Sequence, residues 1–503
     1  MRSKRATYNI ICNLILQIIT LIYGFIVPKI IITHYGSSIN GLVSSITQFL
    51  GYITLLESGV GPVIKAALYK PIAKKNDKEI MGLLLSSERF FRNIAKIFLV
   101  YIVLLLVFYP FIIAKEYDYF FTASLIIIIA VSTFAEYYFG MTYKLLIQAN
   151  QRSYIISIIQ TITYIVAAFM VIVFSKANIT IHTLKLLCTI IFIFRPLLQG
   201  IYVKKIFEIK IPQDVKPVAI KQKWDGMAQH IANVIHNGTD VTLLSIFCSF
   251  EEVSVYSAYA LVIKGIKAVI TAFTNGMDSI FGEMLAKEEK DNLNSKFNLY
   301  ETIYLCICNI IFSCTLVLIT PFIKVYTSGF SDANYIRYTF AILLVIGEYI
   351  WAIRLPYNSI TMSAGKFKET KVGAWVESFL NVIVSLIFIR KYGIIGVTIG
   401  TISAMLYRTV ELIVFSQKNV LFRKIRIAIK KVLLVIANTI IISIIYYNIP
   451  LHTFSSYMTW ALNAIIVFVI SSIEVGLSFG LLYFSDIKML FNYIKSRIWE
   501  RKK

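Results

Sequence analysis

Fourteen apolar segments follow one another along the chain, and each is long enough to cross the roughly 30 Å of hydrocarbon in a membrane. They lie at about 7–33, 41–66, 86–113, 119–149, 154–175, 180–208, 223–250, 253–283, 297–326, 333–362, 370–391, 393–420, 427–449 and 457–484. The connectors between them are short, so none offers room for a soluble domain. This succession predicts an all-α polytopic membrane protein with about 14 transmembrane helices.

The composition departs from that of a soluble protein in the same direction. Hydrophobic residues make up 58% of the 503 residues and charged residues 15%, against about 45–50% and 25% in soluble domains. The N-terminus carries basic residues ahead of an apolar run that is longer than the core of a signal peptide, and no small-residue cleavage site follows it. We therefore expect the first segment to be retained as a membrane span.

The net charge of +23 would suit a nucleic-acid-binding protein, but its distribution argues otherwise. Most of the 50 Lys and Arg residues lie in the N-terminus, in alternate connectors and in the C-terminus, whereas the opposite connectors carry few. This asymmetry is the positive-inside pattern of membrane proteins. It predicts a multi-pass protein of the cytoplasmic membrane, with both termini in the cytoplasm and with membrane lipids rather than nucleic acid around it.

Two stretches of the first half recur in the second half at nearly the same distance. Residues 41–92 align with 256–304 at a shift near 215, and 143–161 align with 357–375 at a shift of 214. The shift predicts a duplicated unit of six spans, and the even number makes the two copies parallel. The expected parts are an N-terminal six-helix lobe at 1–208, a cytoplasmic linker at 209–222, a C-terminal six-helix lobe at 223–420, helices 13 and 14 at 427–484, and a basic cytoplasmic tail at 485–503.

Ionisable residues inside membrane spans are costly and usually face a cavity or a partner. The basic ones here are Arg89, Arg92, Lys96, Lys185, Arg195, Lys264, Lys267, Arg354 and Arg408. The acidic ones include Glu57, Glu136, Asp240, Glu348, Glu377, Glu411 and Glu474. Each of them handles a substrate, pairs with another charge, or extends its charged end to an interface.

Two groups of cations share a helix face. Arg89, Arg92 and Lys96 are spaced i, i+3 and i+7 near the start of the third span, where extension to the interface is the alternative to a function. Lys264 and Lys267 lie near the middle of the eighth span, where the interface is hard to reach. Two like charges at that depth require water or an anion, so we favour a functional role for this pair.

Arg195 and Arg408 occupy related positions in the two halves, at nearly the same shift as the two aligned stretches, and we expect both to face a cavity. Glu411 lies three residues after Arg408, however, and its neutralisation of that arginine is an equal alternative. A proline follows both Arg195 and Arg354 within two residues and interrupts the helical hydrogen bonds. Free backbone groups beside a cation suit a hinge that lines a cavity; the alternative is a kink whose arginine reaches the interface.

Three polar residues are candidates for binding a coupling ion. Asp240 follows Gly238 in the seventh span, and Glu377 and Asn381 are spaced i, i+4 in the eleventh. Oxygen ligands from two helices can hold Na⁺ or take up a proton. Hydrogen bonding between helices is an equally good interpretation of the same residues.

The stretch LLESGVGPVIKAALYKPIAKK, at 55–75, joins the second span to a lysine-rich connector. Gly59, Gly61 and Pro62 are expected gating or hinge points, and Gly61 has its counterpart at Gly276 under the repeat. Glu57 has no such counterpart, because the same shift leads to an alanine. Its expected role is either to pair with a cation or to take part in coupling.

Three longer stretches resemble one protein family: LLESGVGPVIKAALYKPIAKKNDKEI, LIQANQRSYIISIIQT and SAGKFKETKVGAWVESFLNVIVSLIFIRKYGIIGVTIGT. In order and spacing they are similar to the Wzx-like bacterial oligosaccharide flippases of the multidrug/oligosaccharidyl-lipid/polysaccharide (MOP) superfamily. The resemblance implies two six-helix lobes around a central cavity, with helices 13 and 14 appended. It also implies alternating access, which carries a polyprenyl-diphosphate-linked oligosaccharide to the outer leaflet for cell-surface polysaccharide biosynthesis. The expected partners are this lipid-linked oligosaccharide and a polymerase or glycosyltransferases of the same pathway, in a bacterial cytoplasmic membrane.

A diphosphate requires several cations in a shielded cavity, and the lone basic residues of the spans supply them. The expected diphosphate-binding residues are Arg92, Lys96, Arg195, Lys264, Lys267, Arg354 and Arg408. The resemblance further implies coupling to Na⁺ or H⁺. Asp240, Glu377 and Asn381 resemble one such ion site, although the acidic and amide residues of the eleventh span are exchanged in order.

Two other functions compete with this one. A cation-coupled drug antiporter of the same superfamily is the main alternative, but its cavity is expected to carry net acid, whereas the charges within the spans here are neutral to basic. A membrane-embedded polymerase or ligase requires a long outer loop with catalytic residues, and no connector here is that long. We therefore expect no enzyme, no catalytic residue and no cofactor. The six cysteines fall in spans without metal-ligand spacing, so we expect no metal site either.

Overall fold

Helices make up all the regular structure that the computed structural model describes, which covers residues 2–57, 60–113, 116–207, 227–274, 277–449, 454–486 and 488. The chain folds into two units, Met1–Ser254 and Val255–Lys503, and each is described by itself. Gly59 and Gly276, two of the expected hinge residues, lie outside the described residues.

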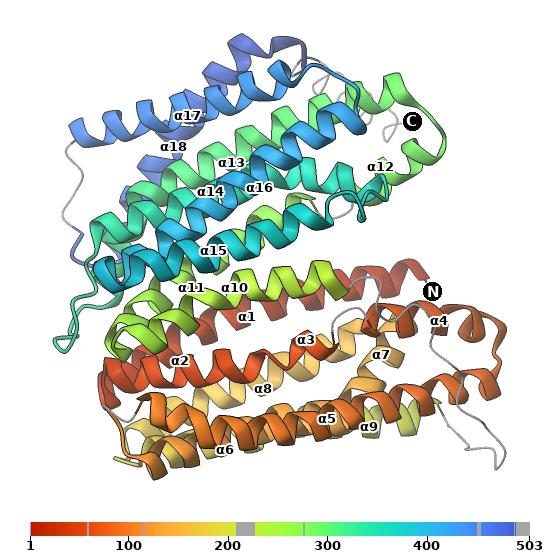
Figure 1. Ribbon diagram of the computed structural model, residues 1–503, viewed down its shortest axis with the longest axis vertical. Helices are drawn as coiled ribbons and strands as arrows, with labels where there is room; N and C mark the ends of the chain where they lie inside the picture. Colours follow the sequence, from red (N-terminus) through yellow and green to blue (C-terminus); the bar gives the residue numbers. More distant parts are fainter. Residues whose placement is uncertain are drawn as a thin grey trace. The chain divides into compact units, whose positions relative to one another are not determined.

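The first unit contains α1 to α10 and one π-helical turn (Figure 1). Its elements are α1 (Arg2–Tyr35), α2 (Ser37–Gly51), α3 (Thr54–Glu57), α4 (Val60–Lys74), α5 (Asp77–Ile113), α6 (Tyr119–Ala135), η1 (Glu136–Gly140), α7 (Met141–Ala149), α8 (Ser153–Ser175), α9 (Ile181–Phe207) and α10 (Met227–Phe247). Helix α8 packs between α1 and α9, and α9 in turn packs on α6 and η1. Helix α10 packs on α2 and α3 and so groups with the first unit, whereas the sequence analysis placed 223–420 in the second lobe.

The second unit contains the helices from α11 onward. They are α11 (Phe250–Thr274), whose first turn belongs to the first unit, α12 (Met277–Ala286), α13 (Lys290–Tyr326), α14 (Tyr338–Ser363), α15 (Lys371–Tyr392), α16 (Ile394–Asn419), α17 (Ile425–Asn448) and α18 (Tyr457–Leu482). Helix α16 packs against both α14 and α15, and α13 packs against α14, α17 and α18. This arrangement brings charged residues of α14, α15 and α16 together.

Thirteen of the described helical segments are long and apolar enough to cross a membrane. The span at 37–57 combines α2 with α3, and the span at 119–149 combines α6, η1 and α7. Helix α10 stands where the remaining predicted span was expected, and its described apolar part, Gly238–Phe247, is shorter. The prediction of an all-α polytopic membrane protein is confirmed.

The last two helices have the inside-out polarity of a membrane protein. Most of their exposed positions are apolar, as at Leu433 (58% exposed) and Leu477 (61%). Their buried positions include polar residues, among them Asn438 on α17 and Asn463 and Ser471 on α18. Small and polar residues hold helices together in a membrane, where lipid is as apolar as the protein core.

The predicted repeat recurs in the helix boundaries. Helices α5 and α13 each have 37 residues and begin at Asp77 and Lys290, and α9 and α16 begin at Ile181 and Ile394, which is the same shift in both pairs. Two connectors carry a residue of positive φ at nearly this shift: Lys75 corresponds to Glu288, and Gln151 to Gly365. Matching helices and matching turns support the duplication that the sequence predicts.

Two glycines one turn apart bring α15 and α16 into close contact. A Cβ at Gly396 would lie 2.5 Å from the backbone carbon of Phe388, and one at Gly400 would overlap Ser385 Oγ. Glycines spaced four residues apart are a known means of close helix packing in membranes. The seam between α15 and α16 is therefore fixed by backbone-to-backbone approach.

Candidate functional site

Helix α14 places three side chains in a line, because Glu348, Trp351 and Arg354 follow one another at intervals of three residues. Residues at this spacing are neighbours on a helix surface. Pro356 lies inside the helix, which nevertheless continues to Ser363. The line joins an ion network around Arg354 to a second ion pair around Glu348.

The buried network, which we call the α14–α16 quartet, consists of Arg354, Glu377, Arg408 and Glu411. Arg354 Nη1 donates to Glu377 Oε1 at 2.6 Å, and Arg408 Nε lies 3.5 Å from Glu377 Oε2. Arg408 Nη1 donates to Glu411 Oε2 at 2.5 Å. Two positive and two negative charges sum to zero, which makes their shared burial tolerable.

Glycine leaves the space that the quartet needs. A Cβ at Gly373 on α15 would overlap the carboxylate of Glu411 on α16. The local sequence KVGAW thus lets Glu411 extend toward Arg408, whose guanidinium also donates to the carbonyl of Thr370 at 3.0 Å. Only 2% of the Arg408 side chain is exposed.

The quartet bears on two sequence interpretations. The pairing of Arg408 with Glu411 is the neutralisation that their i, i+3 spacing indicated. Arg354, whose side chain is 12% exposed, is likewise paired with a carboxylate, that of Glu377. Diphosphate binding by either arginine stays a prediction, and it requires that these carboxylate contacts be exchanged.

A second ion pair joins α11 to α14. Lys267 Nζ lies 2.8 Å from Glu348 Oε2, and it also lies 4.2 Å from the centre of the Trp351 ring. The Lys267 and Glu348 side chains are 21% and 12% exposed. Lys264, three residues earlier on α11, is exposed. The two lysines therefore share a helix face, as their spacing predicts, and one of them is paired with an acid.

The expected ion-binding residues fall in different units. Asp240 is buried on α10 in the first unit, whereas Glu377 and Asn381 lie one turn apart on α15 in the second. Asn381 Nδ2 donates to Thr401 Oγ1 of α16 at 3.1 Å, at the seam that the glycines create. Among the described residues no group of three metal-ligating side chains occurs. Ion binding by Asp240, Glu377 and Asn381 remains a prediction.

Arg195 of the first unit is held by aromatic rings. Its guanidinium lies 4.3 Å from the ring centre of Tyr164 and 4.2 Å from that of Phe192, and Nε donates to Thr163 Oγ1 at 2.7 Å. Its buried Nη2 has no hydrogen-bond partner among the described residues. Cation–π contacts stabilise a guanidinium without neutralising it, so Arg195 keeps its charge inside the span.

The π-helical turn supplies the partner of Glu57. Tyr137 in this turn donates its hydroxyl to Glu57 Oε2 at 2.8 Å. The neighbouring Glu136 forms an ion pair with Lys144 at 2.9 Å. A Cβ at Gly140, which ends the turn, would lie 2.7 Å from Pro196 Cβ, so glycine allows α9 to approach here. The hydrogen-bond partner that the structure provides for Glu57 is a tyrosine hydroxyl, and both roles that the sequence left open, pairing with a cation and coupling, stay predictions.

The other expected site residues lie in the middle of α5 and in the first turn of α4. Arg92 is exposed, pairs with Glu88 at 2.6 Å and lies 5.1 Å from the Tyr138 ring centre; Lys96, one turn further, is also exposed. Gly61 is buried and Pro62 exposed in the first turn of α4. A hinge at these residues stays a prediction.

Sequence reasoning missed a charged cluster between α13 and α17. Glu301 accepts from Lys431 at 2.8 Å and from Arg423 at 2.8 and 2.9 Å, and Glu301 and Lys431 are both fully buried. Lys431 lies within the predicted span at 427–449 but is absent from the basic residues that the sequence analysis names inside spans. The sequence pattern that could have indicated the burial of Lys431 is its helical spacing with Val435 and Asn438, which are buried on the same face of α17.

A polar network without charges fixes the same helices deeper in the span. Asn309 on α13 donates to the Tyr349 hydroxyl at 2.7 Å, and Asn438 on α17 donates to Asn309 Oδ1 at 3.1 Å. Asn438 also donates to Ser478 Oγ of α18 at 2.7 Å. Helices α17 and α18 are therefore bound to the rest of the second unit by specific hydrogen bonds.

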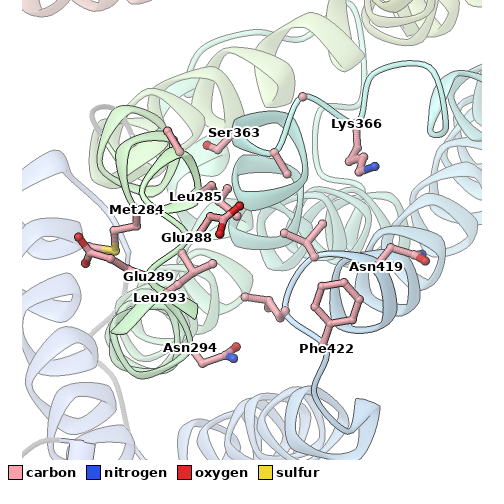
Figure 2. A pocket seen from close by; sticks show the side chains of 16 residues that line it. Met284, Leu285, Glu288, Glu289, Leu293, Asn294, Ser363, Lys366, Asn419 and Phe422 are labelled. Atoms are coloured by element: carbon pink, nitrogen blue, oxygen red, sulfur yellow. The ribbon is translucent and has the colours of Figure 1, made fainter. Parts of the chain in front are cut away.

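A cavity of about 740 Å³ opens in the second unit where α12 ends, α13 begins and α14 and α16 end. Figure 2 shows its apolar side chains, such as Leu293 and Phe422, beside the polar Glu288 and Asn294. Lys366 at its edge donates to Glu369 at 3.0 Å, and this hydrogen bond lowers the pKa of the Glu369 carboxyl. Nothing in its lining repeats the charge pattern of α11 and α14, so we assign it no role in the site.

The sequence matches no family model and no curated protein. Its helices, by contrast, define a polytopic membrane protein. Among solved structures the chain is similar to the lipid II flippase MurJ in an inward-closed conformation, with a TM-score of 0.69 and 17% identity over 95% of this chain and 99% of that one.

Drug transporters of the superfamily match as well. An inward-facing MATE family multidrug transporter has a TM-score of 0.57 and 12% identity over 82% of this chain and 96% of that one. The MATE multidrug transporter DinF-BH, in complex with rhodamine 6G, has a TM-score of 0.54 and 13% identity over 84% of this chain and 96% of that one. At such identities the likeness establishes the fold.

Proposed function

We propose that the protein is a flippase that moves a polyprenyl-diphosphate-linked oligosaccharide from the cytoplasmic to the outer leaflet of a bacterial cytoplasmic membrane. The observation that carries the proposal is the likeness to MurJ over nearly the full length of both chains. The substrate would pass by alternating access, for cell-surface polysaccharide biosynthesis, with both termini of the protein in the cytoplasm. A polymerase or glycosyltransferases of the same pathway would be its partners.

The distribution of charge supports an anionic substrate. The α14–α16 quartet is neutral in itself, whereas Lys267 pairs with Glu348 and the neighbouring Lys264 is exposed. Lys264 is therefore a surplus cation beside this pair. A diphosphate is the kind of group that would complete its charge balance.

Helices α17 and α18 favour the flippase over the drug antiporter. Buried contacts of Lys431 and Asn438 bind α17 to α13, so these two helices are an integral part of the second unit. The similarity to MurJ extends over 95% of this chain, against 82% and 84% for the two MATE transporters. The antiporter nevertheless stays a second candidate, because DinF-BH is a drug transporter that was solved with rhodamine 6G bound.

Reconstitution into liposomes tests the proposal. The vesicles contain a polyprenyl diphosphate that bears a disaccharide with a fluorescent NBD label, and the impermeant reductant dithionite removes the label from the outer leaflet. Active protein is expected to expose the label of the inner leaflet, under a Na⁺ gradient or a proton gradient, because coupling to one of these ions is part of the proposal. The matching Lys264→Gln and Lys267→Gln variants are expected to slow this exposure.

Two controls separate the alternatives. Lys430→Gln removes an exposed lysine from α17 and is expected to leave the rate unchanged. Uptake of rhodamine 6G into the same vesicles, in the absence of lipid translocation under either gradient, would contradict the flippase and support the antiporter. Full translocation by both lysine variants would contradict the role of the α11 cations.

A further inference from the structure

The Lys267–Glu348 pair differs from the α14–α16 quartet in its geometry. In the quartet, Arg354 and Glu377 make an aligned hydrogen bond of 2.6 Å. Glu348 Oε2 lies 2.8 Å from Lys267 Nζ but is not aligned as a hydrogen-bond acceptor with any partner among the described residues. A close but misaligned pair loses the directional part of a charge-assisted hydrogen bond, so this contact is the easier one to exchange.

The lysine of this pair also divides its contacts between two groups on α14. Besides the carboxylate of Glu348 it faces the ring of Trp351, at 4.2 Å from the ring centre. Since Glu348 and Trp351 are three residues apart, both contacts end if Lys267 moves away from α14. The indole ring of Trp351 therefore contacts Lys267 only while the Lys267–Glu348 ion pair is formed.

The local net charge gives a reason for Lys267 to move away from α14. Lys264 is exposed one turn before Lys267 on the same face of α11, so the three ionised groups carry a net charge of +1. An anion that binds both lysines would complete this balance, and it would compete with Glu348 for Lys267. Lysine suits such an exchange, because its ammonium is a point charge on a flexible stem.

We propose that the Lys267–Glu348 pair is a latch between α11 and α14 that the diphosphate of the substrate opens by displacing Glu348 from Lys267. The proposal rests on the flippase function and adds Glu348 and Trp351 to the residues that serve it. Glu348 is a positioning residue here: while the site is empty it holds Lys267 on Trp351, and when the substrate leaves it recaptures the lysine. The anionic class of the ligand follows from the net charge, and its competition with Glu348 follows from the shared lysine.

Binding measurements on the purified full-length protein test the latch without transport. Farnesyl diphosphate is the probe, and binding is followed by tryptophan fluorescence and by isothermal titration calorimetry. Binding is expected to change the fluorescence of the wild-type protein but not of Trp351→Phe. Glu348→Gln is expected to tighten binding about tenfold, because removal of a competing charged contact is worth on the order of one tenfold step. Lys267→Gln is expected to weaken it by a similar factor.

Matched variants keep the test sharp. Glu348→Asp retains the charge on a shorter side chain and is expected to tighten binding by less than Glu348→Gln. The Asp variant also keeps the test possible if the Gln variant fails to fold. Glu474→Gln removes another carboxylate from a span, on α18, and is expected to leave affinity unchanged. Equal or weaker binding by folded Glu348→Gln and Glu348→Asp overturns the latch but leaves the flippase standing. A wild-type protein that binds no farnesyl diphosphate overturns both.

Translocation kinetics distinguish the latch from an ion pair that only stabilises the fold. In the NBD-lipid assay, Glu348→Gln is expected to lower the maximal rate while it lowers the lipid concentration at half-maximal rate, because the substrate is held but not expelled. A lower maximal rate without a lower lipid concentration at half-maximal rate would indicate that Glu348 only stabilises the fold. This result would contradict the latch.

Discussion

Charged residues within the spans differ in how fully they are buried, and we expect this difference to separate structural from functional roles. Glu301 and Lys431 have no exposed side-chain surface, whereas Lys267 keeps 21% of its side chain exposed. A fully buried pair exchanges partners only if the helices separate. An open pair can exchange its partner for a ligand, so we assign the former to stability and the latter to function.

Loss of Lys431 should leave the buried Glu301 carboxylate with Arg423 as its remaining cationic partner. Lys431→Met is expected to lower the free energy of unfolding by about 1–3 kcal/mol, the usual cost of losing a buried hydrogen bond to a charged group. Thermal unfolding of the detergent-solubilised protein measures the change. The control is Lys430→Met, which removes the exposed neighbouring lysine. Equal stability of the two single lysine variants would contradict the assigned role.

The close packing of α15 on α16 makes a prediction at the scale of helices. Gly396→Ala is expected to destabilise the protein by about 1–3 kcal/mol, because its Cβ would meet the backbone of α15 and force the helices apart. Gly480→Ala on α18 is the matched control, since nothing lies within 4 Å of the Cβ it would add. The control should be neutral or slightly stabilising, as alanine is the better helix former. Thermal unfolding compares the two, and similar melting temperatures would count against the glycine seam.

The helices also show which side-chain contacts a local sequence pattern can predict. The pairing of Arg408 with Glu411 was foreseeable, because residues three apart on a helix are neighbours. The pairing of Glu301 with Lys431 was not, because the two residues are 130 positions apart and only the packing of α17 on α13 brings them together. Trp351 escaped notice for the same reason: its spacing with Glu348 is local, but the lysine that faces it comes from α11.

At the scale of the whole molecule the sequence was most informative, since apolar length and basic connectors are properties of segments rather than of single contacts. The repeat was foreseeable for the same reason, and the equal lengths of α5 and α13 support it. The grouping of α10 with α2 and α3 was not foreseeable, because it depends on contacts that no apolar pattern specifies.

The basic connectors predict the orientation of the chain in the membrane. In a background without the six native cysteines, Ser331→Cys between α13 and α14 should react with a membrane-impermeant maleimide on intact cells. Lys287→Cys between α12 and α13 should react only after permeabilisation, because its connector belongs to the basic, cytoplasmic side. Both positions are exposed, so access of the reagent and not burial decides the outcome. The reverse labelling pattern would contradict the proposed orientation.

The neutrality of the α14–α16 quartet has an electrical consequence. A single elementary charge that crosses the membrane field does work of about 2.3 kcal/mol per 100 mV. Arg354, Glu377, Arg408 and Glu411 carry no net charge together, so a displacement of their three helices along the field would do almost no such work. Of the charges on α11 and α14–α16, only the surplus at Lys264 should then add to the voltage sensitivity that the charge of the cargo brings to transport.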